Sequence, residues 1–193
     1  APAQFNEYAT LAEVGIRSVA HAFVDDEKLE LEWQGLRFHA KPDFQEAEHE
    51  YSRFRELLGA TGATIIDLDA SDKLTIDSIY TRDSILVGPK GLILCNMGRA
   101  SRTPEASENA AAYRDLGYQV TGQITAPGTL EGGDFIWLDR YHAAVGLGPR
   151  TNTEGIDQLR TLLGPAVELH VVTLPEPDHP CLLYTSPSPR DSD

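Results

Sequence analysis

Cysteine is scarce in this sequence of 193 residues, which contains only Cys95 and Cys181. Two cysteines do not make the disulfide framework of a small secreted domain. Long apolar runs are missing too, since no stretch approaches the roughly 18 residues that a membrane-spanning helix needs. The first residues lack the basic and apolar regions of a signal peptide. Together these absences predict a soluble protein of a reducing, cytoplasmic setting that has no membrane role.

Basic residues are few as well. The sequence has 16 Lys and Arg against 30 Asp and Glu, a formal net charge of -14. Such a surface repels phosphate backbones and anionic lipid, which argues against a nucleic-acid partner, whereas small cationic ligands are compatible with it. The histidines show no metal-ligand spacing, and no phosphate loop or nucleotide fingerprint is present. We therefore expect neither a metal nor a cofactor.

What is present is an ordinary core-forming composition, with 41% hydrophobic residues. Residues 11–24 favour a strand over EVGIRSV followed by a loop, with a helix as the rival interpretation because alanines are present. From Asp43 apolar residues recur at spacings of three and four, which predicts a helix that is capped by Asp43 with Glu46 and ends at Gly59. The alternating, β-branched residues 64–69 predict a strand.

Two further segments repeat one order of elements. The first has predicted strands at 78–88 and 91–97, a helix from a Thr103 cap to Gly117, and an extended return. The second has strands at 135–139 and 141–148, a helix capped by Thr151 with Glu154, a stop at Gly164 and a returning strand. A strand, strand, helix, strand order at a spacing of about 50 residues is typical of propeller-like repeats. The sequence thus predicts an α/β fold built as a ring of such modules.

The end of the chain breaks this pattern. CLLYTSPSPRDSD, residues 181–193, crowds proline and serine without periodicity, which predicts disorder. The same letters look like the translation of a sequencing-library adapter. We therefore expect residues 181–193 to be a non-native tail and the natural chain to be interrupted there.

Charged side chains gather at the predicted strand ends and module junctions: Asp77, Asp83, Glu131, Asp134 and Arg150. Each taken singly is more simply a solvated turn residue or a helix cap. In a ring of modules, however, such points converge on the centre. Carboxylates and one cation brought together suit a substrate with a guanidinium at one end and a carboxylate at the other.

Three motifs carry a resemblance to a known group of proteins. DSIYTRD (77–83), LEGGD (130–134) and GLGPRTN (146–152), in this order and spacing, resemble the guanidino-modifying (pentein) superfamily. This group includes dimethylarginine dimethylaminohydrolase, arginine deiminase and the amidinotransferases. The resemblance covers residues 6–175. It implies a pentein-type α/β propeller with a little over three of its five blades present, and residues 1–180 as an incomplete catalytic domain.

The resemblance also implies roles for single residues. Asp83 and Glu131 would hold the guanidinium, and Glu131 would also hold a catalytic histidine. Arg150 would bind the substrate carboxylate, Asp77 and Tyr80 would line the amino-acid end, and Asp134 would be a further substrate-binding residue. Some relatives carry a carboxylate-binding arginine near Asn96, where this chain offers Arg99 and Arg102 a few residues on.

The remaining catalytic groups are harder to match. The resemblance implies a nucleophilic cysteine near the natural C-terminus, beyond the end of this chain, and neither cysteine here matches its position. Cys95, inside a predicted strand, is expected to be a buried, inert thiol, and Cys181 lies in the tail. His179 stands at about the distance of the catalytic histidine, although PDHP lacks the family's His-Leu pattern.

The predicted function is therefore that of a cysteine-dependent hydrolase of a guanidino compound. It would convert arginine or an N-methylated arginine to citrulline plus ammonia or an amine, without a cofactor. One alternative is an amidinotransferase, which passes the amidino group to an acceptor amine. Another is that the 193 residues are a non-catalytic fragment or binding module. Whether the full-length protein forms a homo-oligomer is left open.

Overall fold

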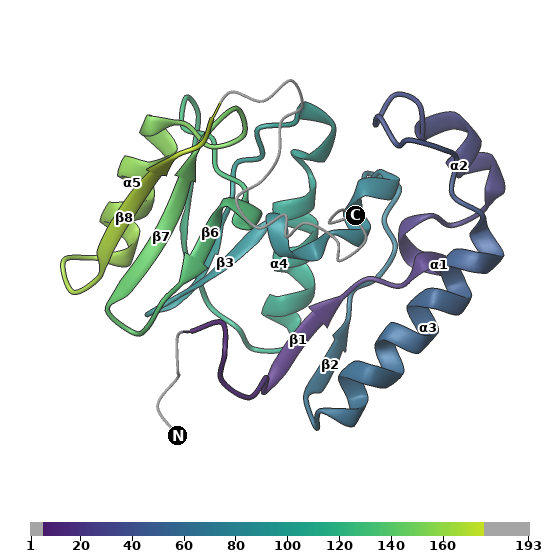
Figure 1. Cartoon of the computed structure of the whole chain (residues 1–193), viewed down its shortest axis with the longest axis horizontal. Helices are drawn as coiled ribbons and strands as arrows, with labels where there is room; N and C mark the ends of the chain where they lie inside the picture. The colour runs from purple at the N-terminus through teal and green to yellow at the C-terminus, as the bar shows by residue number, and fades with distance from the viewer. Residues whose placement is uncertain (1–5, 176–193) are drawn as a thin grey trace, which may run out of the picture. The chain divides into compact units, whose positions relative to one another are not determined.

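The computed structural model describes residues 6–175 of the chain (Figure 1). These residues fall into two compact units. Unit 1 contains Arg82–Arg99 and the chain from Gln119 onward, together with the residues up to Tyr8. Unit 2 contains Ala9–Thr81 and Ala100–Tyr118. Within the part of the chain that is described, no helix has the length and apolar character needed to cross a membrane.

Unit 2 is built on a two-stranded parallel sheet of β1 (Glu13–Ile16) and β2 (Thr64–Asp67). The chain between these strands forms α1 (Val19–Ala22), α2 (Asp26–Glu32) and α3 (Phe44–Ala60). In Figure 1, α3 runs beside β2.

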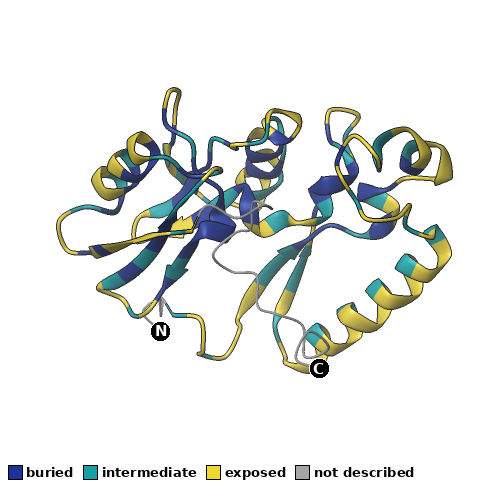
Figure 2. Ribbon diagram, turned by 45° about the horizontal axis from the view of Figure 1, so that its top comes forward, coloured by how far each residue is buried: buried dark blue, intermediate teal, exposed yellow. Residues whose placement is uncertain are grey.

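The start of α3 follows from its sequence. The Asp43 carboxylate accepts a hydrogen bond from the backbone N–H of Glu46 at 2.9 Å, which confirms the predicted cap. The helix has no fully buried residue, and its outer face is exposed along its length (Figure 2). Its apolar stripe, which includes Phe44 and Tyr51, packs half-buried on the core of unit 2.

The buried apolar side chains of that core come from the segment after β1, from α2 and the loop that follows it, and from η1 (Ile76–Ile79), a short 3-10 helix. They are Val19, Ala22, Phe23, Leu29, Leu36 and Ile76. The predicted strand EVGIRSV is confirmed only over Glu13–Ile16. Beyond it, the Ser18 side chain accepts a hydrogen bond from the N–H of His21 and caps the start of α1. Serine is a preferred capping residue, so a helix begins here and the strand does not continue.

Unit 1 holds two three-stranded sheets. One has the order β3 (Ile85–Gly88), β4 (Gly91–Leu94), β5 (Val120–Gln123). The other has the order β6 (Phe135–Trp137), β7 (His142–Leu147), β8 (Glu168–Thr173). In each sheet the first pair of strands is antiparallel and the second pair is parallel.

The predicted module order is present in both segments. In sequence, α4 (Glu105–Asp115) lies between β4 and β5, and α5 (Thr153–Leu163) lies between β7 and β8. Helix α5 lies along β7 in Figure 1 and buries Ile156, Leu159 and Leu163, one stripe at helical spacing. These side chains join both sheets of unit 1 in one apolar core.

Three local predictions were wrong. Residues 78–83 do not extend β3 but form η1 and η2 (Thr81–Asp83), since long-range bonds to the backbone of residues 76–80 hold a turn there. Helix α4 begins after Pro104, without a side-chain cap from Thr103. Helix α5 is capped by Asn152 rather than Thr151. His179, the boundary at residue 180 and the tail 181–193 lie outside the described residues.

Candidate functional site

The charged residues of the LEGGD and PRTN motifs lie in unit 1, next to the ends of its short strands. Glu131 immediately precedes η4 (Gly132–Asp134), which leads into β6, and Arg150 lies in the loop between β7 and α5. Asp83 ends η2, just before β3. Asp83, Glu131 and Asp134 are all buried. Unit 1 therefore keeps three carboxylates largely away from water, which requires that their charges be compensated locally.

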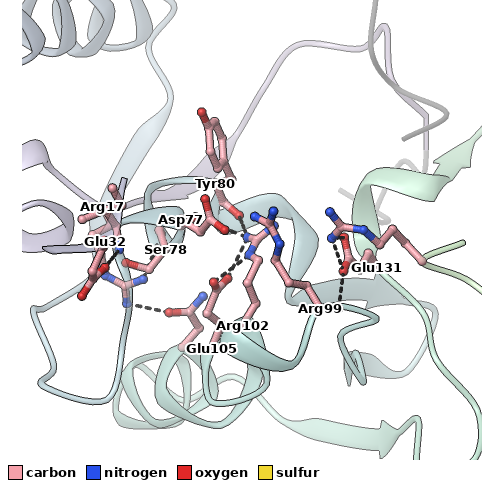
Figure 3. A network of polar contacts seen from close by, with 12 residues as sticks. Arg17, Glu32, Asp77, Ser78, Tyr80, Arg99, Arg102, Glu105 and Glu131 are labelled. Atoms are coloured by element: carbon pink, nitrogen blue, oxygen red, sulfur yellow. Dashed lines mark hydrogen bonds and ion pairs between the residues drawn. The ribbon is translucent and has the colours of Figure 1, made fainter. Parts of the chain in front are cut away.

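Glu131 is held by an arginine side chain and by a backbone N–H. Its side chain has 0% exposure. The Arg150 guanidinium donates from Nη1 to Oε1 at 2.9 Å and to Oε2 at 3.0 Å. The backbone N–H of Arg99 donates to Oε1 at 3.2 Å, a contact drawn in Figure 3. This carboxylate thus already binds one guanidinium, that of Arg150.

Thr151 ties the two motifs together. Its hydroxyl donates to Asp134 Oδ2 at 2.6 Å and accepts from the backbone N–H of Glu131 at 3.2 Å. Sequence reasoning assigned Thr151 to a helix cap and missed this role. Asn152 next to it takes the cap, accepting from the N–H of Gly155 at 2.8 Å. Thr151 and Asn152 are both residue types that cap helices, and a helix start needs only one such residue. The sequence could therefore have indicated that one of the two has a different role.

Two glycines allow the close packing of these loops. A Cβ on Gly132 would overlap the carbonyl oxygen of Arg82, and a Cβ on Gly98 would lie 2.6 Å from the carbonyl oxygen of Arg150. Side chains at these positions would push apart the segments that carry Asp83, Glu131 and Arg150. The first glycine of LEGGD is therefore a packing requirement of the site.

Cys95 is a buried thiol near two of the carboxylates. Its side chain is 2% exposed. Burial raises the pKa of the Cys95 thiol well above its usual value, and the negative charges of Asp83 and Glu131 raise it further. A thiol that stays protonated is a poor nucleophile. The expected burial of Cys95 is confirmed.

Asp77 and Tyr80 belong to unit 2. Asp77 is 4% exposed within η1, and Tyr80, the residue that ends η1, is 54% exposed. Both line a cavity of about 270 Å³. Its other walls come from a loop before α3: Leu36, Arg37, Phe38 and His39.

The structure thus gathers Asp83, Glu131, Asp134 and Arg150 in unit 1, and Asp77 with Tyr80 in unit 2. Arg99 belongs to the first group and Arg102 to the second. His179 and Cys181 lie outside the described residues. Within residues 6–175, no group of histidine, cysteine and acidic side chains has the arrangement of a metal site.

Comparison with known proteins identifies the family. The model of the arginine deiminase family matches residues 76–175, more than half of the chain and the part that contains every motif above. The chain belongs to the arginine deiminase family. It is thereby a member of the guanidino-modifying (pentein) superfamily, as the motifs predicted.

Relatives in sequence agree with this assignment. The chain is 32% identical over 146 residues to the dimethylarginine dimethylaminohydrolase of Streptomyces coelicolor, a match that covers 74% of this chain and 55% of that protein. It is 30% identical over 129 residues to an uncharacterised protein of Aeropyrum pernix, covering 66% and 47% of the two chains. The chain spans about half the length of these relatives.

Solved structures agree in fold. The dimethylarginine dimethylaminohydrolase of Pseudomonas aeruginosa, a cysteine-to-serine variant complexed with citrulline, matches with a TM-score of 0.69 and 25% identity, covering 89% of this chain and 64% of that one. An amidinotransferase of the saxitoxin pathway of Microseira wollei matches in fold, with a TM-score of 0.64 and 20% identity, covering 88% and 61%. The chain therefore has the α/β fold of this family.

Proposed function

We propose that this chain contributes the guanidinium-binding half of an enzyme that hydrolyses arginine or an N-methylated arginine to citrulline and ammonia or an amine. The observation that carries the proposal is the contact between Glu131 and Arg150. A buried carboxylate that accepts twice from a guanidinium nitrogen provides the charge and acceptor geometry that a guanidino substrate requires. The Arg150 side chain stands in for that substrate.

The second carboxylate of the proposed site is Asp83. It is 6% exposed and close enough to Cys95 that both it and Glu131 raise the pKa of that thiol. A planar guanidinium presents donors along its edges, so two buried carboxylates keep it charged and fix its orientation. When the substrate enters, Arg150 leaves Glu131 and takes the substrate carboxylate. Asp134 then supports this exchange by holding Thr151, beside Arg150 in the chain.

Asp77 and Tyr80 would bind the amino-acid end. The cavity that they line has one buried carboxylate and one half-exposed aromatic ring, a combination that suits an α-ammonium group next to an aliphatic chain.

The chemical step requires a thiolate that attacks the guanidinium carbon and a histidine that protonates the departing amine, after which water releases the ureido product. The burial and raised pKa of Cys95 argue against Cys95 as that thiolate. His179 stays a prediction, and we assign the thiolate to a cysteine that is not among residues 6–175. The relatives' greater length is consistent with further blades of a five-bladed propeller supplying these groups.

The experiment is a substrate panel on the full-length protein. L-arginine, the monomethylated and dimethylated arginines and agmatine are each incubated with enzyme, and ureido product and released amine are quantified. Formation of citrulline in equal amount to the amine supports the proposal, and no turnover of any guanidino compound refutes it. Adding glycine separates the rival chemistry, because an amidinotransferase forms a new guanidino product in place of citrulline.

A further inference from the structure

Strand β6 forms one edge of its sheet, since within the described residues it pairs only with β7. In an antiparallel pair, the N–H and C=O groups of every second residue point away from the partner strand. The carbonyl oxygen of Phe135 and the N–H of Trp137 are such groups, because both bond to side chains from outside the sheet. Backbone groups at a sheet edge need partners of this kind, since unpaired ones are costly to bury and attract other strands.

Two charged side chains occupy this edge. Arg82 donates from Nη2 to the carbonyl oxygen of Phe135 at 3.1 Å. Glu7 accepts through Oε1 from the N–H of Trp137 at 3.4 Å. A neighbouring strand would offer β6 the same combination of one donor and one acceptor, so the two side chains take the place of a strand.

The same two side chains are joined to each other. Arg82 donates from Nη2 to Glu7 Oε1 at 3.1 Å and from Nη1 to Oε2 at 3.4 Å, which is the two-pronged geometry of an arginine on a carboxylate. Asn6 turns the segment that carries Glu7, because its Oδ1 accepts from the N–H of Tyr8 at 3.1 Å. The ion pair and its bonds to β6 therefore form a closed ring of contacts.

Arg82 also contacts the LEGGD motif through its backbone. A Cβ on Gly132 would lie 2.3 Å from the carbonyl oxygen of Arg82. The backbone of Arg82 thus lies against Gly132, while its side chain holds Phe135 further along the same segment. Arg82 is in this way fixed to both ends of residues 132–135.

The two carboxylates proposed to bind the guanidinium lie directly beside these contacts. Asp83 follows Arg82 in the chain, and Glu131 precedes Gly132. Both carboxylates raise the pKa of the Cys95 thiol, so both lie near one point of unit 1. The spacing between Asp83 and Glu131 therefore depends on how Arg82 is held against the LEGGD motif.

Stability alone is a weak explanation for this ion pair. The side chains of Arg82 and Glu7 are 44% and 28% exposed. An ion pair this exposed adds little to the free energy of unfolding, because water screens it and two long side chains lose freedom. A carboxylate that orients a reacting group is far more sensitive, since a displacement of about 1 Å can lower a rate by about a hundredfold.

We propose that Arg82, paired with Glu7 and bonded to the outer edge of β6, is a positioning residue that holds Asp83 at its working distance from Glu131. Glu7 has the same role through Arg82, so the segment 6–8 takes part in the guanidinium site without contacting the substrate. This inference rests on the proposed function, which assigns both carboxylates to the guanidinium. All of its residues belong to unit 1, and it concerns only the guanidinium end of the substrate.

The test compares R82K and E7Q with wild type in the full-length protein. In R82K, a single nitrogen cannot reproduce the planar fork onto Glu7 and also reach Phe135. The inhibition constant of methylguanidine, a guanidinium without an amino-acid end, is measured alongside turnover of L-arginine. We expect this constant to rise about tenfold in R82K and kcat to fall by at least that factor, because the guanidinium is the group that reacts. In E7Q, Arg82 keeps its bond to Phe135, so both changes should be smaller and in the same direction.

The double variant E7Q/R82K shows whether the two residues act as one unit. If they do, the single effects do not add, and the inhibition constant of the double variant stays within about twofold of that of R82K. The thermal midpoint of each variant should lie within about 4 °C of wild type, so that weaker binding is measured on folded protein. Circular dichroism checks folding, and E7Q decides the test if R82K does not fold.

The matched control is R55K. Arg55 also forks a carboxylate, that of Asp67, and the two side chains are 41% and 50% exposed. This pair joins α3 to β2 in unit 2 and lies outside every motif of the site. The inhibition constant and kcat of R55K should match those of wild type.

Wild-type inhibition constants in folded R82K and E7Q, additive effects in the double variant, or an equal change in R55K would overturn the inference, while turnover by wild type leaves the proposed function standing. If the wild-type protein neither turns over L-arginine nor binds methylguanidine, the proposed function falls and the inference falls with it.

Discussion

At the scale of single residues, the account rests on how a buried carboxylate is compensated. Glu131 has no exposure to water and accepts from Arg150 and from the backbone N–H of Arg99. Arg150 is 22% exposed and so retains some contact with solvent. This difference in exposure between Arg150 and Glu131 suits the proposed exchange, in which Arg150 leaves Glu131 for the substrate carboxylate. The Glu131 side chain stays in place, and the Arg150 side chain moves.

Removing the cation should therefore cost stability. In R150M, Glu131 is left as a buried charge without its ion-pair partner. The free energy of unfolding should fall by about 2–3 kcal/mol, less than the ~3–5 kcal/mol of a fully buried pair because Arg150 is partly hydrated. Urea denaturation followed by tryptophan fluorescence measures this. The double variant R150M/E131Q should recover part of the loss, and a double variant that is less stable than R150M alone would contradict the account.

Cys95 gives a second prediction at this scale. Because burial raises the pKa of its thiol, the Cys95 peptide should remain unlabelled by iodoacetamide at pH 8 in the folded chain and become labelled in urea. Peptide mapping by mass spectrometry reads Cys95 separately from Cys181. Rapid labelling of Cys95 in native conditions would show that the thiol is accessible and would reopen it as a nucleophile.

At the scale of elements, the start of α5 links fold and site. Asn152 caps the helix through Gly155, accepts from the N–H of Thr129 at 2.8 Å, and donates to the carbonyl oxygen of Pro127 at 2.9 Å. The same residue thus starts a helix and anchors the loop that leads into LEGGD. Asn152, the last residue of PRTN, therefore holds in place the loop that leads into LEGGD.

The variant N152A removes all of these bonds. We expect the free energy of unfolding to fall by about 1–2 kcal/mol, at the upper end for a lost helix cap because the loop contacts are lost with it. The control T153A changes an exposed residue of the first helical turn and should stay within about 0.5 kcal/mol of wild type. Equal stability of N152A and T153A in thermal unfolding would show that the cap and the loop contacts contribute nothing.

An element could be predicted where the interactions that form it join residues close in the sequence, and could not where they join distant ones. The apolar spacing after Asp43 and the glycine at 164 act within a few residues, so α3 and the end of α5 could be predicted. The turn at 76–80 could not, because it is held by Arg17 and Arg102, which are distant in sequence. The acids assigned to the site from motifs stay a prediction, whereas the bonds of Thr151 to Asp134 and to the N–H of Glu131 could not be predicted because these partners are distant in sequence.

At the scale of the whole molecule, the candidate site residues are divided between the two units. Unit 1 carries Asp83 and Glu131, proposed to bind the guanidinium, Arg150, proposed to bind the substrate carboxylate, and Asp134, which holds Thr151. Unit 2 carries Asp77 and Tyr80. The family assignment and the α/β fold stand on the comparisons, while the ring of five blades remains a proposal. The chain spans about half of its curated relatives, so the reaction itself has to be tested on the full-length protein.

The central claim is that Asp83 and Glu131 bind the substrate guanidinium. The most direct test measures the rate of citrulline formation from L-arginine and dimethylarginine. The proteins compared are wild type and the variants D83N, E131Q and D139N. Asp139 is an exposed carboxylate that accepts hydrogen bonds in a surface turn of the same unit, which makes D139N the matched control. The account predicts turnover by wild type and D139N, and a loss of about a hundredfold or more in kcat/KM for D83N and E131Q, because each leaves a guanidinium without its charge partner. Folded D83N and E131Q proteins that form citrulline at the wild-type rate would contradict it.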